Sequence, residues 1–182
     1  IKNLKMFKSI IISGELAQDH EFIYPFYRLL EENSKLDVCL IGGKPVKGIL
    51  GTNLPPNKDY PVKDIDNVKP SDYELLVIPG GVKAMEKIRQ NKKLISFISE
   101  FYNFDNTKVI ACICSGTQLL ISAKIVKGKK ISGYYSMRDD INNAGAIYTD
   151  QEVVYDQRIF TTAHYKDMGP WLKAAIKFVY EN

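Results

Sequence analysis

A cysteine stands where a buried strand is predicted to turn into a helix. The run from Val109 to Ile113 is apolar and rich in β-branched residues, and Cys114-Ser115-Gly116 and a helix-like pattern over Thr117 to Ala123 follow it. This arrangement is typical of a nucleophile elbow, in which a tight turn holds the apex residue toward a substrate. The following helix N-terminus should favour the thiolate of Cys114. The alternative is that Cys114 is a small buried hydrophobic residue, as most free cysteines are.

The elements that must position this cysteine alternate between strand and helix. Buried strands are expected over Lys8 to Ser13, Leu36 to Ile41 and Tyr73 to Ile78, and amphipathic helices over Glu21 to Glu32, Lys83 to Arg89, Lys92 to Phe104 and Met168 to Tyr180. Such alternation predicts an α/β fold with a mostly parallel central sheet covered by helices on both faces.

Two stretches have a looser pattern. Lys44 to Ser71 contains five prolines and predicts short edge strands and loops. After the elbow we expect short strands and one helical turn, namely strands over Lys129 to Gly133, Ala146 to Thr149, Val153 to Tyr155 and Arg158 to Thr162, and the turn over Ser136 to Asn143.

In open parallel sheets the chemistry lies at the carboxyl ends of the strands. Four loops meet this condition: Gly14 to His20, Gly80 to Lys83, Cys114 to Thr117, and Ala163 to Asp167. The last loop contains His164, whose ordinary pKa of about 6.5 suits proton transfer near neutrality. We therefore consider His164 a candidate base, although a structural role is the usual one for a lone histidine.

Composition sets the broad class. The chain of 182 residues is expected to form a single domain over residues 1–182, and its net charge of +4 comes from scattered lysines rather than a basic stripe. We therefore predict no nucleic-acid partner, and the absence of a long apolar run predicts no membrane partner. Three cysteines fit neither a disulfide framework nor a zinc site, so we expect a reducing, cytoplasmic location and no metal or cofactor.

Four segments together resemble the ThiJ/PfpI family, within the class I glutamine amidotransferase-like superfamily. They are Asp72 to Gly81, Ala111 to Ala123, Gly133 to Ala146 and Glu21 to Leu29. The resemblance implies a flavodoxin-like three-layer sandwich that forms a homodimer or a larger homo-oligomer. It implies that Cys114 is the elbow cysteine and that the Gly81 and Ser115 backbone N–H groups are oxyanion donors. Tyr134 and Tyr135 stand where members of the family line the pocket, and packing in the core is an equal alternative for them.

The sequence departs from the family pattern at three positions. Ser115 stands where the family commonly has histidine. Counting back from Tyr24-Pro25, the position of the family's cysteine-bonded glutamate falls on Gln18. Glu15, a possible pocket residue, could substitute for it only with a rebuilt loop. Ala163-His164 replaces a common Ser-Arg pair, near where the wider superfamily has its triad histidine.

These features support two kinds of function. The first is a cysteine-dependent enzyme, a hydrolase, amidase or lyase acting on a small carbonyl, amide or nitrile-like substrate, with Cys114 as nucleophile and Gln18 or His164 as its polar partner. The second is a redox or stress-response protein that senses oxidation through Cys114. A binding or chaperone-like scaffold without catalysis is a third interpretation.

Overall fold

The main sheet has seven strands, and the central ones are almost entirely buried. The computed structural model describes residues 4–182. The spatial order is β10-β11-β7-β6-β1-β2-β5, and every neighbouring pair is parallel except β10 with β11. The strands are β1 (Phe7–Ser13), β2 (Ser34–Leu40), β5 (Val62–Lys63), β6 (Leu75–Ile78), β7 (Val109–Ile113), β10 (Val154–Asp156) and β11 (Ile159–Thr162).

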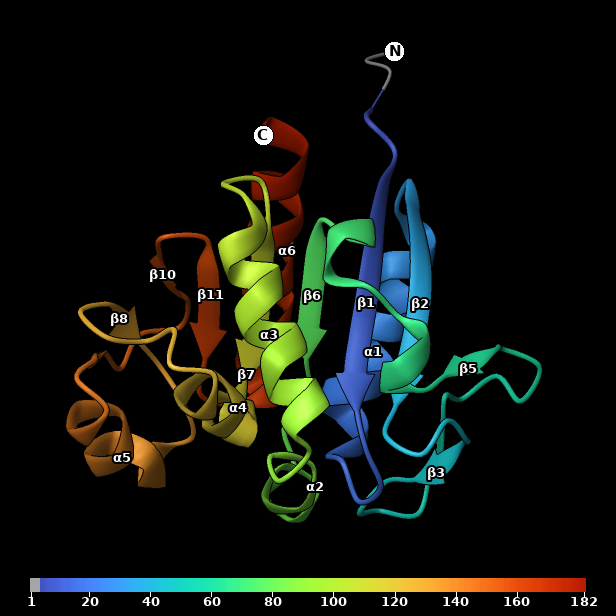
Figure 1. Cartoon of the computed structure of the whole chain (residues 1–182), viewed down its shortest axis with the longest axis horizontal. Helices are drawn as coiled ribbons and strands as arrows, with labels where there is room; N and C mark the ends of the chain where they lie inside the picture. The colour runs from blue at the N-terminus through green and yellow to red at the C-terminus, as the bar shows by residue number, and fades with distance from the viewer. Residues whose placement is uncertain (1–3) are drawn as a thin grey trace.

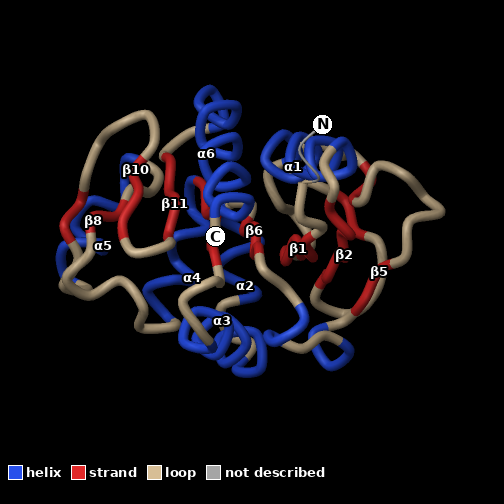
Figure 2. Tube along the Cα trace, turned by 90° about the horizontal axis from the view of Figure 1, so that it is seen from above, coloured by secondary structure: helices blue, strands red, loops and turns tan. Residues whose placement is uncertain are grey.

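Helices cover both faces of this sheet, which gives three layers. Figure 2 shows α1 (Asp19–Glu31) and α6 (Met168–Glu181) on one face, and α2 (Val82–Ile88), α3 (Lys92–Phe104) and α4 (Thr117–Ser122) on the other. A further helix, α5 (Arg138–Asn143), lies beyond the β10 edge (Figure 1). The predicted α/β fold with a mostly parallel sheet is confirmed. No helix within residues 4–182 is both long and apolar enough to cross a membrane.

The loosely patterned stretches form small elements outside the main sheet. Strands β3 (Val46–Lys47) and β4 (Asn53–Leu54) make one separate pair, and β8 (Lys130–Ile131) and β9 (Ile147–Tyr148) make another. Short 3-10 turns complete the chain: η1 (Ile65–Asn67), η2 (Pro70–Asp72), η3 (Cys114–Gly116), η4 (Tyr135–Met137) and η5 (Tyr165–Asp167).

The strand order brings the predicted loops to one edge of the sheet. β2 lies on one side of β1, while β6 and β7 lie on the other, so the order reverses direction between β1 and β6. In open α/β sheets a ligand-binding crevice forms at such a switch point, outside the carboxyl ends of the strands. The loops after β1, β6 and β7 therefore meet at the lower edge in Figure 1.

Candidate active site

Cys114 lies at the apex of the predicted elbow. It follows the buried strand β7 and opens the 3-10 turn η3, with a positive φ of 59°. A non-glycine residue in this left-handed region costs about 1–3 kcal/mol, and such strain is concentrated at functional sites. Cys114 is partly exposed, whereas Cys39 and Cys112 are buried. The nucleophile elbow is thus present, and its thiol is the accessible one among the three cysteines.

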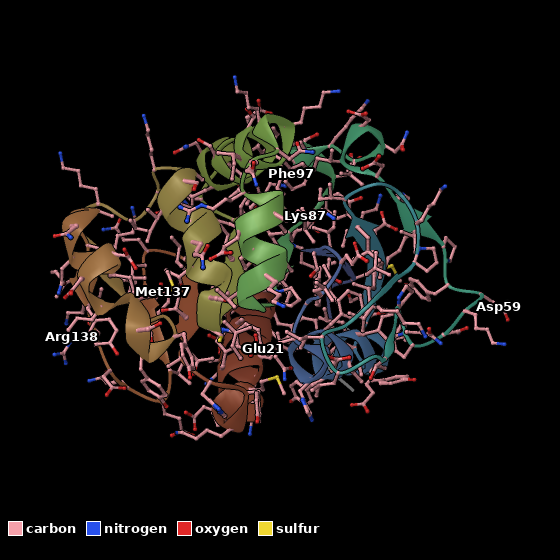
Figure 3. All side chains as sticks on the ribbon, turned by 90° about the horizontal axis from the view of Figure 1, so that it is seen from below. Glu21, Asp59, Lys87, Phe97, Met137 and Arg138 are labelled. Atoms are coloured by element: carbon pink, nitrogen blue, oxygen red, sulfur yellow. The ribbon has the colours of Figure 1, made fainter. Side chains whose placement is uncertain are left out.

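A buried carboxyl group lies beside the sulfur. The Glu21 residue is only 1% exposed, its Oε1 accepts a hydrogen bond from the Gly80 backbone N–H at 2.8 Å, and its carboxyl group hydrogen-bonds the Cys114 thiol. In Figure 3, which shows the molecule from below, Glu21 lies near the middle of this edge. A Cβ at Gly80 would stand 2.5 Å from Glu21 Oε1 and 3.0 Å from Cys114 Cβ. Glycine at position 80 therefore allows the thiol and the carboxyl group to approach each other.

Burial changes the acid–base properties of both groups. It raises the pKa of Glu21 to about 7, although the hydrogen bonds from Gly80 and Cys114 act in the opposite direction. Burial and then the Glu21 charge raise the pKa of the Cys114 thiol to about 12. The prediction that the helix N-terminus keeps Cys114 as a thiolate is therefore wrong, because the net shift of its pKa is upward. The α4 helix has only six residues and follows a 3-10 turn, and the lowering of the thiol pKa by Ser115 is smaller than the effect of burial.

Ser115 connects the predicted oxyanion donors. Its Oγ accepts a hydrogen bond from the Gly81 N–H at 2.9 Å, and both its hydroxyl and its backbone N–H hydrogen-bond the Cys114 sulfur. The Gly81 N–H, predicted to face a substrate oxyanion, is therefore engaged by a side chain in this structure. The Ser115 hydroxyl thus lies between this N–H group and the sulfur.

A cavity of about 370 Å³ opens over the sulfur. Its lining residues come from five separate segments: Gln18, Ile49, Gly81, Val82, Cys114, Ser115, Gln118, Tyr134, Ser136 and Met137. Most of this wall is apolar, and its polar side chains are amides, hydroxyls and the thiol. None of these lining residues carries a formal charge, so the cavity suits a small neutral ligand.

The structure corrects the predicted roles of Gln18 and Glu15. Gln18 lies in the cavity wall, but it caps α1: its Oε1 accepts from the Glu21 N–H at 3.2 Å, and its Nε2 lies 3.1 Å from His20 Nδ1. Glu15 is exposed and pairs with Lys87 at 3.3 Å. The carboxylate partner of the sulfur is instead Glu21, because α1 begins at Asp19 and its first turn directs Glu21 inward.

His164 has partners within its own loop. It precedes η5, its Nδ1 accepts a hydrogen bond from the Lys166 N–H at 3.1 Å, and its ring lies 4.1 Å from the Tyr165 ring, between centroids. Tyr165 also stacks on His20 at 4.9 Å, so the fourth predicted loop meets the first loop. The titratable side chain recorded against the thiol is Glu21, whereas the recorded partners of His164 lie in its own loop.

The two tyrosines after β8 have different surroundings. Tyr134 lies in the cavity wall, and its N–H donates to the Cys114 carbonyl at 3.1 Å. Tyr135 is exposed and packs against Tyr134 at 5.5 Å, outside the cavity lining. The predicted pocket position therefore applies to Tyr134, while Tyr135 supports it from outside.

Glu21 is the residue that sequence reasoning placed in a helix without assigning it to the site. Two signals pointed to it. It opens the Glu21 to Leu29 segment that carries part of the family resemblance, and it lies directly before the apolar Phe22 in the first turn of the helix. An acidic residue there usually stabilises the helix from the surface, so burial was not expected.

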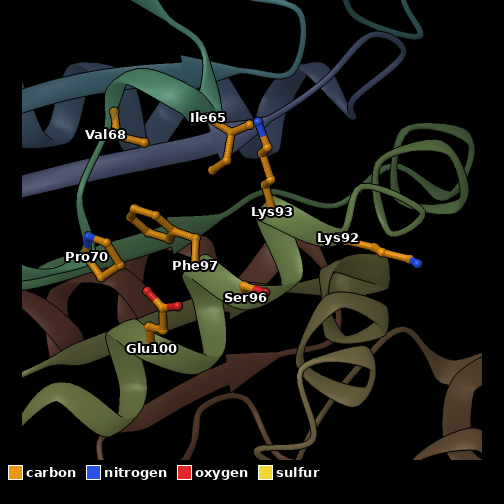
Figure 4. A pocket seen from close by; sticks show the side chains of 8 residues that line it. All are labelled: Ile65, Val68, Pro70, Lys92, Lys93, Ser96, Phe97 and Glu100. Carbon is orange, nitrogen blue, oxygen red and sulfur yellow. The ribbon is translucent and has the colours of Figure 1, made fainter.

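A second cavity, of about 320 Å³, lies between α3 and the segment joining η1 to η2 (Figure 4). Its lining includes Lys93, Ser96, Phe97 and Glu100, with no cysteine or histidine among the lining residues. It therefore offers no thiol, and no imidazole that could activate Ser96. Within residues 4–182, no group of three or more His, Cys, Asp or Glu side chains is placed to hold a metal ion.

Comparisons with known proteins identify the family and the fold of the chain. The model of the DJ-1/PfpI family matches residues 8–177. "Deglycase PfpI" of Pyrococcus furiosus is 33% identical over 94% of this chain and 99% of its own length, and "General stress protein 18" of Bacillus subtilis is 36% identical over 90% and 91%. Among solved structures, Schizosaccharomyces pombe DJ-1 superposes with a TM-score of 0.81 at 21% identity, over 93% of this chain and 90% of its own, which shows the same flavodoxin-like fold. The chain therefore belongs to the DJ-1/PfpI family.

Proposed function

We propose that the protein is a cysteine-dependent enzyme that attacks the carbonyl carbon of small neutral compounds, with Cys114 as nucleophile and Glu21 as proton carrier. The observation that carries this proposal is the strained apex thiol hydrogen-bonded to a buried carboxyl group at the floor of an uncharged cavity. The names of relatives support the chemistry: one is a "Deglycase" from Pyrococcus furiosus and one a "Putative cysteine protease" from Bacillus subtilis, both 33% identical.

The pKa order of the two groups defines the first step. The pKa is about 12 for the Cys114 thiol and about 7 for the Glu21 carboxyl group, so complete proton transfer from the thiol to Glu21 before attack is unfavourable. Ionised Glu21 therefore accepts the thiol proton while the sulfur attacks. A carbon–sulfur bond forms, the carbonyl π electron pair moves to oxygen, and Glu21 returns the proton to that oxygen. The product is a neutral hemithioacetal, and no oxidant or reductant is required.

Ser115 has two tasks in this step. Before attack its hydroxyl hydrogen bonds the sulfur while its Oγ accepts from the Gly81 N–H. As Glu21 takes the thiol proton and the carbon–sulfur bond forms, negative charge develops on the carbonyl oxygen, and a rotation about the Ser115 Cβ–Oγ bond turns the hydroxyl hydrogen toward that oxygen. Removing one donor of this kind typically lowers kcat about 100-fold or more.

A substrate panel tests the proposal. Methylglyoxal, phenylglyoxal, a simple amide, a peptide and an isonitrile should be incubated with the wild type, with Cys114→Ser and with the matched control Cys39→Ala, which removes a buried thiol on β2. We expect turnover of at least one glyoxal by wild type and control, and none by Cys114→Ser. Turnover that survives Cys114→Ser would overturn the proposal.

A second candidate function rests on the same pair. A protonated Glu21 beside Cys114 offers a hydrogen-bond donor to an oxidised sulfur, and "General stress protein 18" of Bacillus subtilis is 36% identical. Two equivalents of peroxide would convert the thiol to a sulfinic acid, with release of two water molecules. Intact mass after peroxide treatment should then show a stable gain of two oxygen atoms at Cys114. Further oxidation to the sulfonic acid at the same rate would contradict this candidate.

A further inference from the structure

The turn that joins β3 to β4 reaches over the cavity of Cys114. It spans residues 48–52, and the Ile49 side chain forms part of the cavity wall. Ile49 remains 43% exposed, so it covers the cavity from the solvent side rather than from the core. Its neighbour Leu50, at the same turn, is 65% exposed and is not part of the lining.

A buried carboxylate fixes the position of this turn. Asp19, in the first turn of α1, is 2% exposed. Its Oδ2 accepts from the Leu50 N–H at 2.8 Å, and its Oδ1 accepts from the Thr52 N–H at 3.0 Å. Hydrogen bonds between a carboxylate and backbone N–H groups are among the stronger ones in proteins. The two bonds bind the middle and the last residue of the turn and hold its backbone on α1.

The backbone adds contacts to the loop that follows β1. The Ile49 N–H donates to the Ala17 carbonyl at 2.9 Å, and the Leu16 N–H donates to the Lys47 carbonyl at 2.9 Å. A Cβ at Gly48 would lie 2.1 Å from Asp19 Oδ1, so a side chain there is incompatible with this contact. The turn thus rests on the same loop and helix start that carry Glu21, and Ile49 has a fixed place relative to the thiol.

We infer that Ile49 limits the size of the substituent admitted to Cys114, and that Asp19 is the positioning residue that holds Ile49 there. The inference deepens the proposed function: the favoured carbonyl compounds carry a short neutral group, and bulky ones meet the Ile49 wall. Asp19 touches neither substrate nor sulfur and acts only through the turn.

Alkylation of Cys114 measures this limit without any turnover. The rate with iodoacetamide and the rate with its N-benzyl derivative are determined at one pH by peptide mass. Both reagents need the same thiolate, so the ratio of the two rates cancels any change in the Cys114 pKa and reports access alone. The ratio is therefore informative even if Cys114→Ser leaves substrate turnover intact and the proposed function fails.

The expected results differ for Ile49, which lines the cavity, for Asp19, which holds the turn, and for Leu50, which lies outside the lining. Ile49→Ala should raise the bulky-to-small ratio by on the order of 10-fold, the usual scale of discrimination by a few methylenes in an apolar pocket. Asp19→Ala should raise it in the same direction, and Leu50→Ala should leave it at the wild-type value. If Asp19→Ala does not fold, Asp19→Asn, which places an amide N–H group against one of the two backbone donors, takes its place.

An unchanged ratio in Ile49→Ala would overturn the inference as a whole. A raised ratio in Ile49→Ala together with an unchanged ratio in the folded Asp19 variant would overturn the positioning role of Asp19. An equal rise in Leu50→Ala would show general loosening of the turn and would also contradict the assignment. If the proposed function holds, Ile49→Ala should also raise the ratio of kcat/KM for phenylglyoxal to that for methylglyoxal by on the order of 10-fold.

Discussion

Replacing Glu21 by glutamine should change how stability depends on pH. The pKa of Glu21 is about 7 in the folded protein, against 4.5 for an unperturbed glutamate. Between these values the native state binds more protons than the unfolded state, so this group makes stability fall as pH rises through the window from 4.5 to 7. The glutamine side chain stays neutral and keeps an oxygen that accepts from Gly80.

The size of the effect follows from the two pKa values. A difference of about 2.5 pH units corresponds to about 3 kcal/mol. Below pH 4.5 Glu21→Gln and the wild type should have similar stability with respect to this group. Above pH 7 the variant should be more stable by up to about 3 kcal/mol, because the wild type must hold a charged carboxylate in a buried position.

Urea unfolding at pH 5 and pH 8, with a reducing agent present, measures the stability difference between Glu21→Gln and the wild type at each pH. The matched control is Glu86→Gln, which removes an exposed carboxylate on α2. We expect the stability gain of Glu21→Gln to grow between pH 5 and pH 8 while the control follows the wild type. A Glu21 variant that parallels the wild type at both pH values, or loses stability at pH 8, would refute the reasoning.

Three further predictions concern neighbouring groups. Ser115→Ala should slow alkylation of Cys114 severalfold at fixed pH, because two hydrogen bonds near the sulfur are altered and the pKa of the thiol rises. Ser115→Thr should restore the rate, and an unaltered rate in Ser115→Ala would contradict the contact of the Ser115 hydroxyl with the sulfur. His164→Ala should cost about 1 kcal/mol of stability through the lost cap and leave Cys114 alkylation unchanged, whereas a large drop in that rate would return His164 to the site. Sedimentation at micromolar concentration should show a homodimer that Tyr27→Glu weakens, because α1 leaves the 50%-exposed Tyr27 on its outer face; a wild-type monomer would count against this.

The local elements could be predicted because each depends on nearby residues. The apolar run of β7, the small residues after Cys114 and the amphipathic pattern of α3 each define their own structure, and the predicted bounds of α3 match the observed Lys92–Phe104. The alternation of strands and helices then leaves few ways to arrange a parallel sheet. The meeting of the loops after β1, β6 and β7 follows from that arrangement.

The site itself depends on contacts between distant residues, which the sequence pattern does not reveal. Glu21 and Gly80 are 59 residues apart, and the carboxyl group is buried because Gly80 has no side chain. Counting back from Tyr24-Pro25 gave Gln18, which caps α1, whereas the carboxyl group beside the sulfur lies three residues further along the chain, at Glu21. The raised thiol pKa likewise depends on burial and on Glu21, while helix position alone predicts the opposite direction.

Asp19 illustrates the same limit. An aspartate in the first turn of a helix is ordinarily explained by the helix dipole. Its two hydrogen bonds to Leu50 and Thr52 span more than 30 residues and appear only in the folded chain. Two buried acidic residues in the first turn of α1 thus connect separate parts of the site. Asp19 binds the turn that covers the cavity, and Glu21 binds the Cys114 thiol.

The most direct test of the pairing of Cys114 with Glu21 is the pH profile of Cys114 alkylation by iodoacetamide. Alkylation needs the thiolate, so the wild-type rate should rise with pH, level off near pH 7, where Glu21 ionises and its charge raises the pKa of the thiol, and rise again toward the thiol pKa of about 12. In Glu21→Gln the inflection near pH 7 should be absent, and the rate at pH 8 should be higher than in the wild type, because the variant lacks the charge that raises the pKa of the thiol. The same inflection in wild type and Glu21→Gln would contradict the pairing.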